Sequence, residues 1–206
     1  RRTAAQAGIE SQTNQQMNDI LGYHRKKGVI TGAASGMGEA AAQLLVNLGA
    51  EVYALDIEPV SVTVTEAIQV DMKDPASIDA AVTALPAEIY ALFNCAGVPS
   101  PPFSAVDTVL INFVGLRYLT EALVPRIAEG GGIASIASTA GMAWRPKLEK
   151  VQKFLGLDGS FDAAKQWMSD NPQDCADGYG FSKQCIIVYT MQMAKELAGR
   201  NIRINC

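Results

Sequence analysis

The chain has 206 residues, of which 49% are hydrophobic, and a net charge of −4. This length and apolar content suit one compact domain with a substantial core. The acidic balance gives no electrostatic reason to expect nucleic acid as a partner, and no apolar run reaches the roughly 18 residues that a membrane span needs.

The reactive residue types exclude several kinds of site. The four cysteines contain no C-x-x-C pair, which argues against a zinc site or a disulfide framework. The single histidine, His24, precedes the first predicted strand, so a hydrolase with a histidine base would depend on that one residue. No apolar segment of a signal peptide follows the basic first residues. We therefore expect a cytoplasmic protein without a metal site.

The predicted elements alternate along the chain. Residues 1–16 are polar and aperiodic, which predicts a disordered tail or a cloning remnant ahead of a single domain over 17–206. The predicted strands are 28–31, 51–56, 67–71, 89–94, 132–138 and 201–206. The predicted helices are 36–48, 75–84, 105–128 and 179–199. The gap between the second and third strands is short and β-branched, so we expect no full helix there.

Strands that alternate with helices imply crossover connections. The predicted fold is therefore α/β, a Rossmann-type doubly wound parallel sheet with helices on both faces. Residues 141–178 interrupt the alternation and are predicted to form a helical insertion, because apolar residues recur there at helical spacing between glycines and an Asn-Pro pair. Its aromatic side chains could wall a substrate pocket, or pack as a flap on the sheet or on a neighbouring subunit.

A glycine-rich turn joins the first predicted strand to the helix that follows, in the sequence TGAASGMG at 31–38. Gly32 can take a tight turn, and Gly36 lets the backbone approach a diphosphate. Gly38 permits close packing of helix on strand. Free N–H groups and the helix dipole attract phosphate at such a position. The spacing alone also fits an ordinary loop, but between a strand and a helix it predicts a dinucleotide site.

The second predicted strand ends in Asp56, about twenty residues beyond the glycines. A carboxylate at this place accepts hydrogen bonds from the ribose hydroxyls of NAD and repels the 2′-phosphate of NADP. No lysine or arginine lies within 32–38 or directly after Asp56. NAD is therefore the expected cofactor, although a solvated acid at a strand end would look the same.

Tyr179 and Lys183 are one turn apart on the last predicted helix and share a face. An ammonium group beside a tyrosine stabilises the phenolate, which would let Tyr179 exchange a proton with a substrate oxygen. Ser138 ends the fifth predicted strand, at the sheet edge where ligands bind, and its hydroxyl could hold a carbonyl oxygen. A tyrosine and a lysine at this spacing are also common on ordinary helix surfaces. A serine such as Ser138 also occurs as a helix cap or in a turn.

Together these motifs resemble the short-chain dehydrogenase/reductase family from about residue 26 to the end. The glycine motif T-G-x-x-x-G-x-G is complete, the N-N-A-G element stands as NCAG at 94–97, and Y-x-x-x-K matches the tyrosine and lysine above. The resemblance implies hydride transfer between NAD and an alcohol or carbonyl substrate. It implies as catalytic residues Asn112, Ser138, Tyr179 and Lys183. It implies as cofactor-binding residues Gly32, Ser35, Gly36, Met37, Gly38, Asp56, Asp71, Met72, Asn94, Ala96, Gly97, Tyr179 and Lys183.

The resemblance also implies a role for each catalytic residue. Tyr179 exchanges the proton, and Ser138 holds the substrate oxygen in line. Lys183 grips the nicotinamide ribose, and Asn112 binds a water that carries the proton outward. In the family, the helices that correspond to the segments predicted at 105–128 and 179–199 pair with their copies in a neighbouring subunit. This implies a homodimer or homotetramer.

The chain departs from the family pattern in two places. The long stretch between Ser138 and Tyr179 resembles a subgroup that includes coniferyl-alcohol dehydrogenase and bacterial 3α-hydroxysteroid dehydrogenase/carbonyl reductase. This implies an aromatic alcohol as substrate, with a steroid as the alternative. The family's C-terminal strand and substrate loop are missing, so an inactive fragment is a further alternative. A regulator that binds the dinucleotide without turnover is the alternative from another class, although such proteins usually lack the tyrosine or the lysine.

Overall fold

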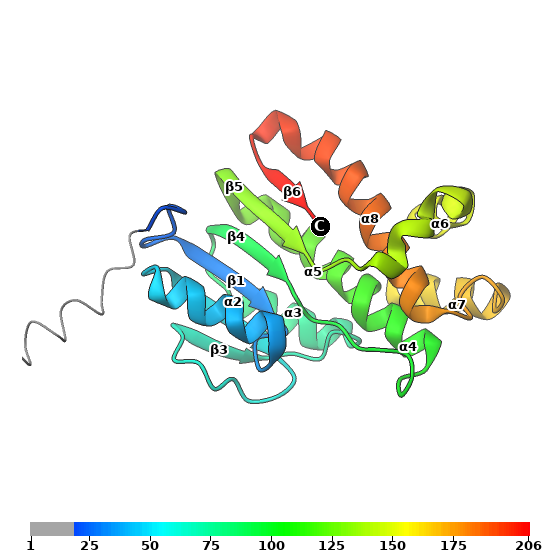
Figure 1. Ribbon diagram of the computed structural model, residues 1–206, viewed down its shortest axis with the longest axis horizontal. Coiled ribbons are helices and arrows are strands. Elements are labelled where there is room, and N and C mark those ends of the chain that lie inside the picture. The colour runs from blue at the N-terminus through cyan, green and yellow to red at the C-terminus, as the bar shows by residue number, and fades with distance from the viewer. Residues whose placement is uncertain (1–18) are drawn as a thin grey trace, which may run out of the picture.

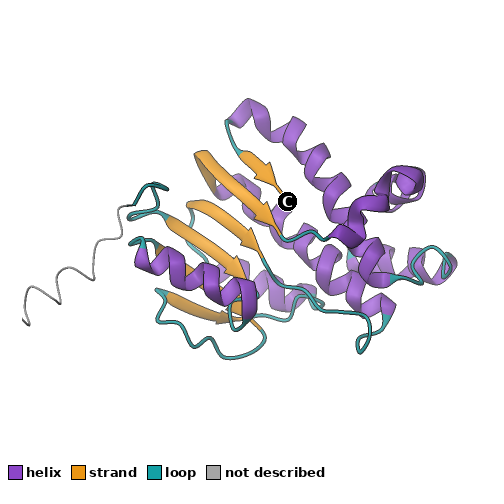
Figure 2. Cartoon of the chain, in the orientation of Figure 1, coloured by secondary structure: helices purple, strands orange, loops and turns teal. Residues whose placement is uncertain are grey.

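The computed structural model describes residues 19–206, so the tail predicted at residues 1–16 lies outside the described residues. Six parallel strands form a sheet in the order β3-β2-β1-β4-β5-β6, with helices on both faces (Figures 1 and 2). The strands are β1 (Lys27–Thr31), β2 (Glu51–Asp56), β3 (Glu66–Gln69), β4 (Ile89–Asn94), β5 (Ile127–Ser135) and β6 (Arg203–Asn205). The strand order reverses between β1 and β4, which confirms the predicted doubly wound, Rossmann-like fold.

Helices connect the strands at all but one crossover of the described chain. The α-helices are α2 (Gly36–Asn47), α3 (Pro75–Ala84), α4 (Ala105–Val109), α5 (Leu116–Leu123), α6 (Leu148–Leu155), α7 (Phe161–Asp170) and α8 (Gly178–Leu197). The other helical segments are a π-helix, η1 (Leu110–Gly115), and the 3-10 segments η2 (Val124–Arg126), η3 (Thr139–Lys147) and η4 (Ala198–Arg200). No helix lies between β2 and β3, as predicted. Within residues 19–206, none of the helices is both long and apolar enough to cross a bilayer.

The sheet is buried on both faces because its side chains alternate between two apolar clusters. Val29 of β1 belongs to the larger cluster and Ile30 to the smaller one, and both are fully buried. Helix α2 covers the smaller cluster through Ala42 and Leu45. Helices α3, α5 and α8 cover the larger one. This burial on both faces is typical of parallel sheets, and it leaves the strand ends as the place for a site.

The predicted insertion forms η3, α6 and α7, which lie together near the start of α8 (Figure 1). Its aromatic rings pack on that helix. The Phe154 ring centroid lies 5.2 Å from that of Phe181, and Trp167 stacks on Phe181 at 5.7 Å. Phe154, Phe161 and Met168 are each at most 3% exposed. These side chains therefore belong to a flap packed within the chain, which favours that interpretation over a substrate-pocket wall.

The predicted helix over 105–128 is divided in the structure. The π-helix separates α4 from α5, and the last turn is 3-10 and ends at Arg126. Pro125 lies in this turn, where its missing N–H excludes a regular helical hydrogen bond. The side-chain pattern predicted the helical segment, but the π-helix has no comparable sequence signal.

Four of the six predicted strands differ in their bounds, and two of these differences move a candidate site residue out of its strand. The strand predicted at 132–138 spans Ile127–Ser135. Its start was placed too late because the glycines at 130–132 are unfavourable in strands. Its end was also placed too late, so Ser138 lies beyond the strand. The strand predicted at 67–71 ends at Gln69, so Asp71 lies in the following loop.

Candidate active site

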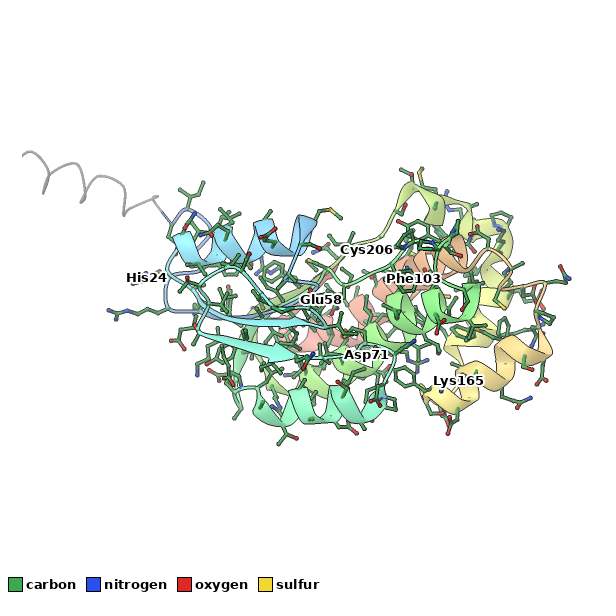
Figure 3. The ribbon with its side chains drawn as sticks, turned by 90° about the horizontal axis from the view of Figure 1, so that it is seen from below. His24, Glu58, Asp71, Phe103, Lys165 and Cys206 are labelled. Carbon is green, nitrogen blue, oxygen red and sulfur yellow. The ribbon has the colours of Figure 1, made fainter. Side chains whose placement is uncertain are left out.

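A cleft of about 520 Å³ lies at the carboxyl ends of β1, β2, β3 and β4. This is the edge at which doubly wound sheets bind ligands. Figure 3 shows two of its lining residues, Glu58 and Asp71, which follow the neighbouring strands β2 and β3. The predicted cofactor residues that line the cleft are Gly32, Ser35, Gly36, Met37, Gly38, Asp56, Asp71, Met72, Ala96 and Gly97.

The glycine turn is packed against the loop that follows β4. Gly32 has a φ of 69°, and a Cβ there would lie 2.7 Å from the main-chain nitrogen of Ala96. A Cβ at Gly38 would collide with the Gly32 carbonyl oxygen. Among the described residues, Ser35 precedes α2 without forming a side-chain cap, so its side chain does not satisfy the first N–H groups of the helix. Since these groups border the cleft, they offer a site for an anion.

Hydrogen bonds hold the carboxylates of two predicted cofactor-binding residues, Asp56 at the end of β2 and Asp71 in the loop after β3. Asp56 accepts a hydrogen bond from the Ala34 nitrogen of the glycine turn at 2.8 Å. Its other oxygen accepts one from the Glu58 nitrogen at 3.0 Å. Asp71 accepts from the Lys73 nitrogen at 2.9 Å. Both carboxylates therefore have fixed places on the lining of one cleft.

Gly97 connects this cleft to three of the predicted catalytic residues. A Cβ at Gly97 would lie 3.2 Å from Asn112 Oδ1 and 3.7 Å from Lys183 Nζ. The Lys183 ammonium donates to the Ile136 carbonyl at 2.6 Å and lies 5.6 Å from the centre of the Tyr179 ring. The fold thus brings together residues that are up to 86 positions apart in the sequence, from 97 to 183.

Lys183 is 4% exposed, although it carries an ionisable amine. Burial lowers its pKa from the ordinary 10.5 to about 8, because the charged form loses hydration, and the nearby Cys95 thiol acts in the opposite direction. Cys95 lines the cleft, and burial raises the pKa of its thiol. The lysine is therefore held in an environment that penalises its charge.

Ser138 lies beside α8, at the start of η3. Its Oγ accepts a hydrogen bond from the Ala140 nitrogen at 3.2 Å, so the serine is a helix cap. Three residues further on, Gly141 packs on the Lys183 carbonyl, where a Cβ would lie 2.8 Å from the oxygen. The cap uses the serine as an acceptor, which leaves its hydroxyl hydrogen for another partner.

The two predicted asparagines make structural contacts. Asn112, in the π-helix, accepts from the Val98 nitrogen at 2.7 Å and donates to the Val98 carbonyl at 3.0 Å. Its side chain therefore fixes the loop after β4. Asn94 is 2% exposed and donates to Thr120 at 3.0 Å and to Ser135 at 3.2 Å. Asn94 ties β4 to its neighbours beneath the cleft and is absent from the cleft lining.

A family model described as short chain dehydrogenase matches residues 26–149. The chain belongs to this family. Coniferyl-alcohol dehydrogenase of Pseudomonas sp. (strain HR199 / DSM 7063) is 36% identical to this short-chain dehydrogenase over 185 residues, which cover 88% of this chain and 71% of that enzyme. D-threitol dehydrogenase of Mycolicibacterium smegmatis is 27% identical, over 87% of this chain and 67% of that enzyme.

Solved structures of the family share its fold. The 3-alpha-hydroxysteroid dehydrogenase from Pseudomonas sp. B-0831, complexed with NADH, has a TM-score of 0.71 and 24% sequence identity, and the match covers 87% of this chain and 70% of that one. A short-chain dehydrogenase/reductase from Burkholderia phymatum, in complex with NAD, has a TM-score of 0.64 at 21% identity, over 89% of this chain and 64% of that one. The family resemblance seen in the motifs is confirmed, and with it an oxidoreductase family.

Sequence reasoning gave no role to one buried residue of this short-chain dehydrogenase. Thr31 is 1% exposed, and its Oγ1 accepts hydrogen bonds from the nitrogens of Cys95 and Ala96, both at 3.1 Å. It thereby joins the end of β1 to the loop after β4. The threonine is the first letter of the glycine motif, but its partners are only apparent once β1 and β4 are known to be neighbours.

We expect Thr31→Val to lower the free energy of unfolding by about 1–3 kcal/mol, because two partly buried N–H groups lose their acceptor. Urea denaturation measures this change. Thr83→Val is the matched control, since the Thr83 hydroxyl is exposed and, within residues 19–206, bonds only the Asp79 carbonyl of its own helix. Equal stability of the two variants would contradict the proposed role of Thr31.

Proposed function

We propose that this short-chain dehydrogenase is an NAD-dependent oxidoreductase that interconverts an alcohol and a carbonyl, with an aromatic, coniferyl-type alcohol as substrate. The observation that carries the proposal is the position of Lys183. Its buried amine lies 5.6 Å from the centre of the Tyr179 ring and borders Gly97 of the cleft. The 36% identity to coniferyl-alcohol dehydrogenase supports the substrate class.

The residues of the cleft fit a dinucleotide. The uncapped start of α2 suits a diphosphate, and Gly32 keeps the turn close to the sheet. Asp56 suits the adenosine ribose hydroxyls, and the Asp71–Met72 segment would border the adenine. When bound, NAD supplies the hydride chemistry, and the protein supplies binding, orientation and electrostatics.

The side chains beside the cleft would handle the proton. In the direction of alcohol oxidation, Tyr179 removes the hydroxyl proton from the substrate, and the positive charge of Lys183 favours the phenolate that accepts it. Ser138 donates its hydroxyl hydrogen to the same substrate oxygen and orients it. Asn112 holds the Val98 loop in place. Within residues 19–206, no three His, Cys, Asp or Glu side chains gather as a metal site.

We also propose that the protein assembles as a homodimer or homotetramer in the cytoplasm. The four-helix interface expected from the family would use α5 and α8. Along α8, residues 180–190 are almost all buried within this chain, where η3 and α6 pack on the helix. The exposed residues of α8 lie further on, between 191 and 196. A four-helix contact would therefore be limited to the C-terminal part of this helix.

Formation of NADH, followed by its absorbance with a panel of alcohols, tests the proposed reaction. We expect turnover with coniferyl alcohol and related aromatic alcohols, at a kcat/KM about tenfold or more above that for 3α-hydroxysteroids. A preference for the steroids would overturn the substrate assignment in favour of the alternative. Binding of NAD without turnover of any alcohol would favour a non-catalytic dinucleotide-binding protein.

A further inference from the structure

Charge is unevenly distributed along the cleft. Three lining residues carry carboxylates, Asp56, Glu58 and Asp71, and one, Lys73, carries an ammonium group. The side-chain Nζ of Lys73 lies 3.5 Å from an Asp107 carboxylate oxygen, so this positive charge already has a partner. A ligand anion near the end of β2 therefore meets a wall of net negative charge.

The backbone that carries Glu58 is held in place on both sides. The Glu58 nitrogen donates to Asp56 at 3.0 Å, and the Gln69 side chain donates to the Ile57 carbonyl at 3.2 Å. Further along the same loop, Ser61 donates to a carboxylate of α2 at 2.7 Å. The Glu58 carboxylate is consequently confined to the rotamers of its own side chain, close to Asp56.

A second hollow of about 250 Å³ adjoins the cleft and is lined by residues 56–60 and 67–69. Residues 56–58 line both spaces and so form the ridge between them. No lysine or arginine is among the described residues that line the hollow. A group that extends from the cleft past Asp56 therefore meets the charges of Asp56 and Glu58, and no cation from the described lining of the hollow.

NADP differs from NAD by a phosphate on the ribose 2′-hydroxyl, the group that Asp56 would bind. We propose that Glu58 is a further specificity-determining residue, which excludes NADP by placing a second carboxylate where a 2′-phosphate would have to lie. This inference rests on the proposed NAD dependence. It implies that replacing Asp56 alone leaves a substantial barrier to NADP.

Fluorescence titration of the protein with NADH and NADPH tests the role of Glu58. In Glu58→Gln we expect the ratio of the NADPH Kd to the NADH Kd to fall about three- to tenfold at low salt. The change should be smaller at high salt, because Glu58 is exposed and its charge is screened. In an Asp56→Asn background, adding Glu58→Gln should lower the NADPH Kd further.

Glu88→Gln is the matched control. Glu88 is also exposed, but it directly precedes β4, at the amino end of the strand and so away from the cleft at the carboxyl ends. Removing its charge should therefore leave the ratio of the two Kd values unchanged. If NADH binds and the ratio stays constant in Glu58→Gln, or falls equally in Glu88→Gln, the inference is overturned while NAD dependence stands. If the unaltered protein binds NADPH as well as NADH, the proposed NAD dependence itself fails, and with it the inference.

Discussion

Replacing Tyr179 with phenylalanine is expected to lower kcat for alcohol oxidation by about 10³-fold. The substitution removes one hydroxyl group and keeps the ring beside the Lys183 ammonium. Without that hydroxyl, the side chain cannot accept the substrate proton. NADH binding should persist, because Tyr179 is absent from the cleft lining. Steady-state kinetics together with NADH titration separate the two effects.

Tyr189→Phe is the matched control for this experiment. Tyr189 lies on the same helix, and its hydroxyl is buried without a hydrogen-bond partner in the described part of the chain. Its ring packs edge-on against Phe113 at 5.9 Å, and the substitution preserves that contact. We expect kcat within about twofold of the unaltered protein. If Tyr179→Phe behaved like this control, the proposed enzymatic role of the tyrosine would be wrong.

Replacing Lys183 with methionine is expected to have opposite effects on activity and on stability. Turnover should fall by about 10²-fold or more, because the charge that favours the Tyr179 phenolate is lost. The cofactor-free protein should gain about 2 kcal/mol of unfolding free energy at neutral pH, because a buried ammonium is replaced by an apolar chain of similar length. This gain allows for the lost hydrogen bond to the Ile136 carbonyl.

The pKa of Lys183 fixes the sign of the pH dependence. Burial lowers this pKa from 10.5 to about 8 in the folded protein, so between these values the unfolded chain binds more protons than the folded chain does. Below pH 8 both states are protonated and the full penalty of the buried charge is present. As the pH rises from about 8 to 10.5, the penalty disappears, and the stability of the unaltered protein should approach that of Lys183→Met.

Urea denaturation across this pH range, with Lys195→Met as the control, measures the effect. Lys195 is an exposed lysine of the same helix, so its removal should change neither turnover nor the pH dependence of stability. A Lys183→Met variant that is less stable than the unaltered protein at neutral pH would contradict the inferred burial penalty.

Much of the fold and many of the candidate residues could be predicted because they depend on patterns of residues that are close together in the sequence. β-Branched runs and helix-length segments predicted the alternation of strands and helices, since each element repeats its apolar residues at its own period. The glycine turn at 31–38 was recognisable because its position between a strand and a helix demands small residues. Its predicted members Gly32 and Gly38 make the close backbone contacts expected of them.

The element boundaries were less predictable where packing overrides propensity. Strand β5 pairs with β4 at Ile127 and again from Gly132 onward, with a register shift between these two pairs, and Gly132 also pairs with β6. Asn112 of the π-helix bonds to Val98, which precedes it by 14 residues in another segment. Neither feature has a local sequence signal, because both depend on partners that only the folded chain provides.

The sequence by itself determined the parallel α/β fold, the family, and the residue types at the strand ends. Only the tertiary structure decided which of those residues meet: that Asn112 and Lys183 lie close to Gly97, that Thr31 bonds the loop after β4, and that Asn94 bonds Thr120. It also decided that the insertion packs on α8. The physical reason is that periodicity and turn chemistry act over a few residues, whereas burial and hydrogen bonding across a sheet depend on neighbours that are distant in the chain.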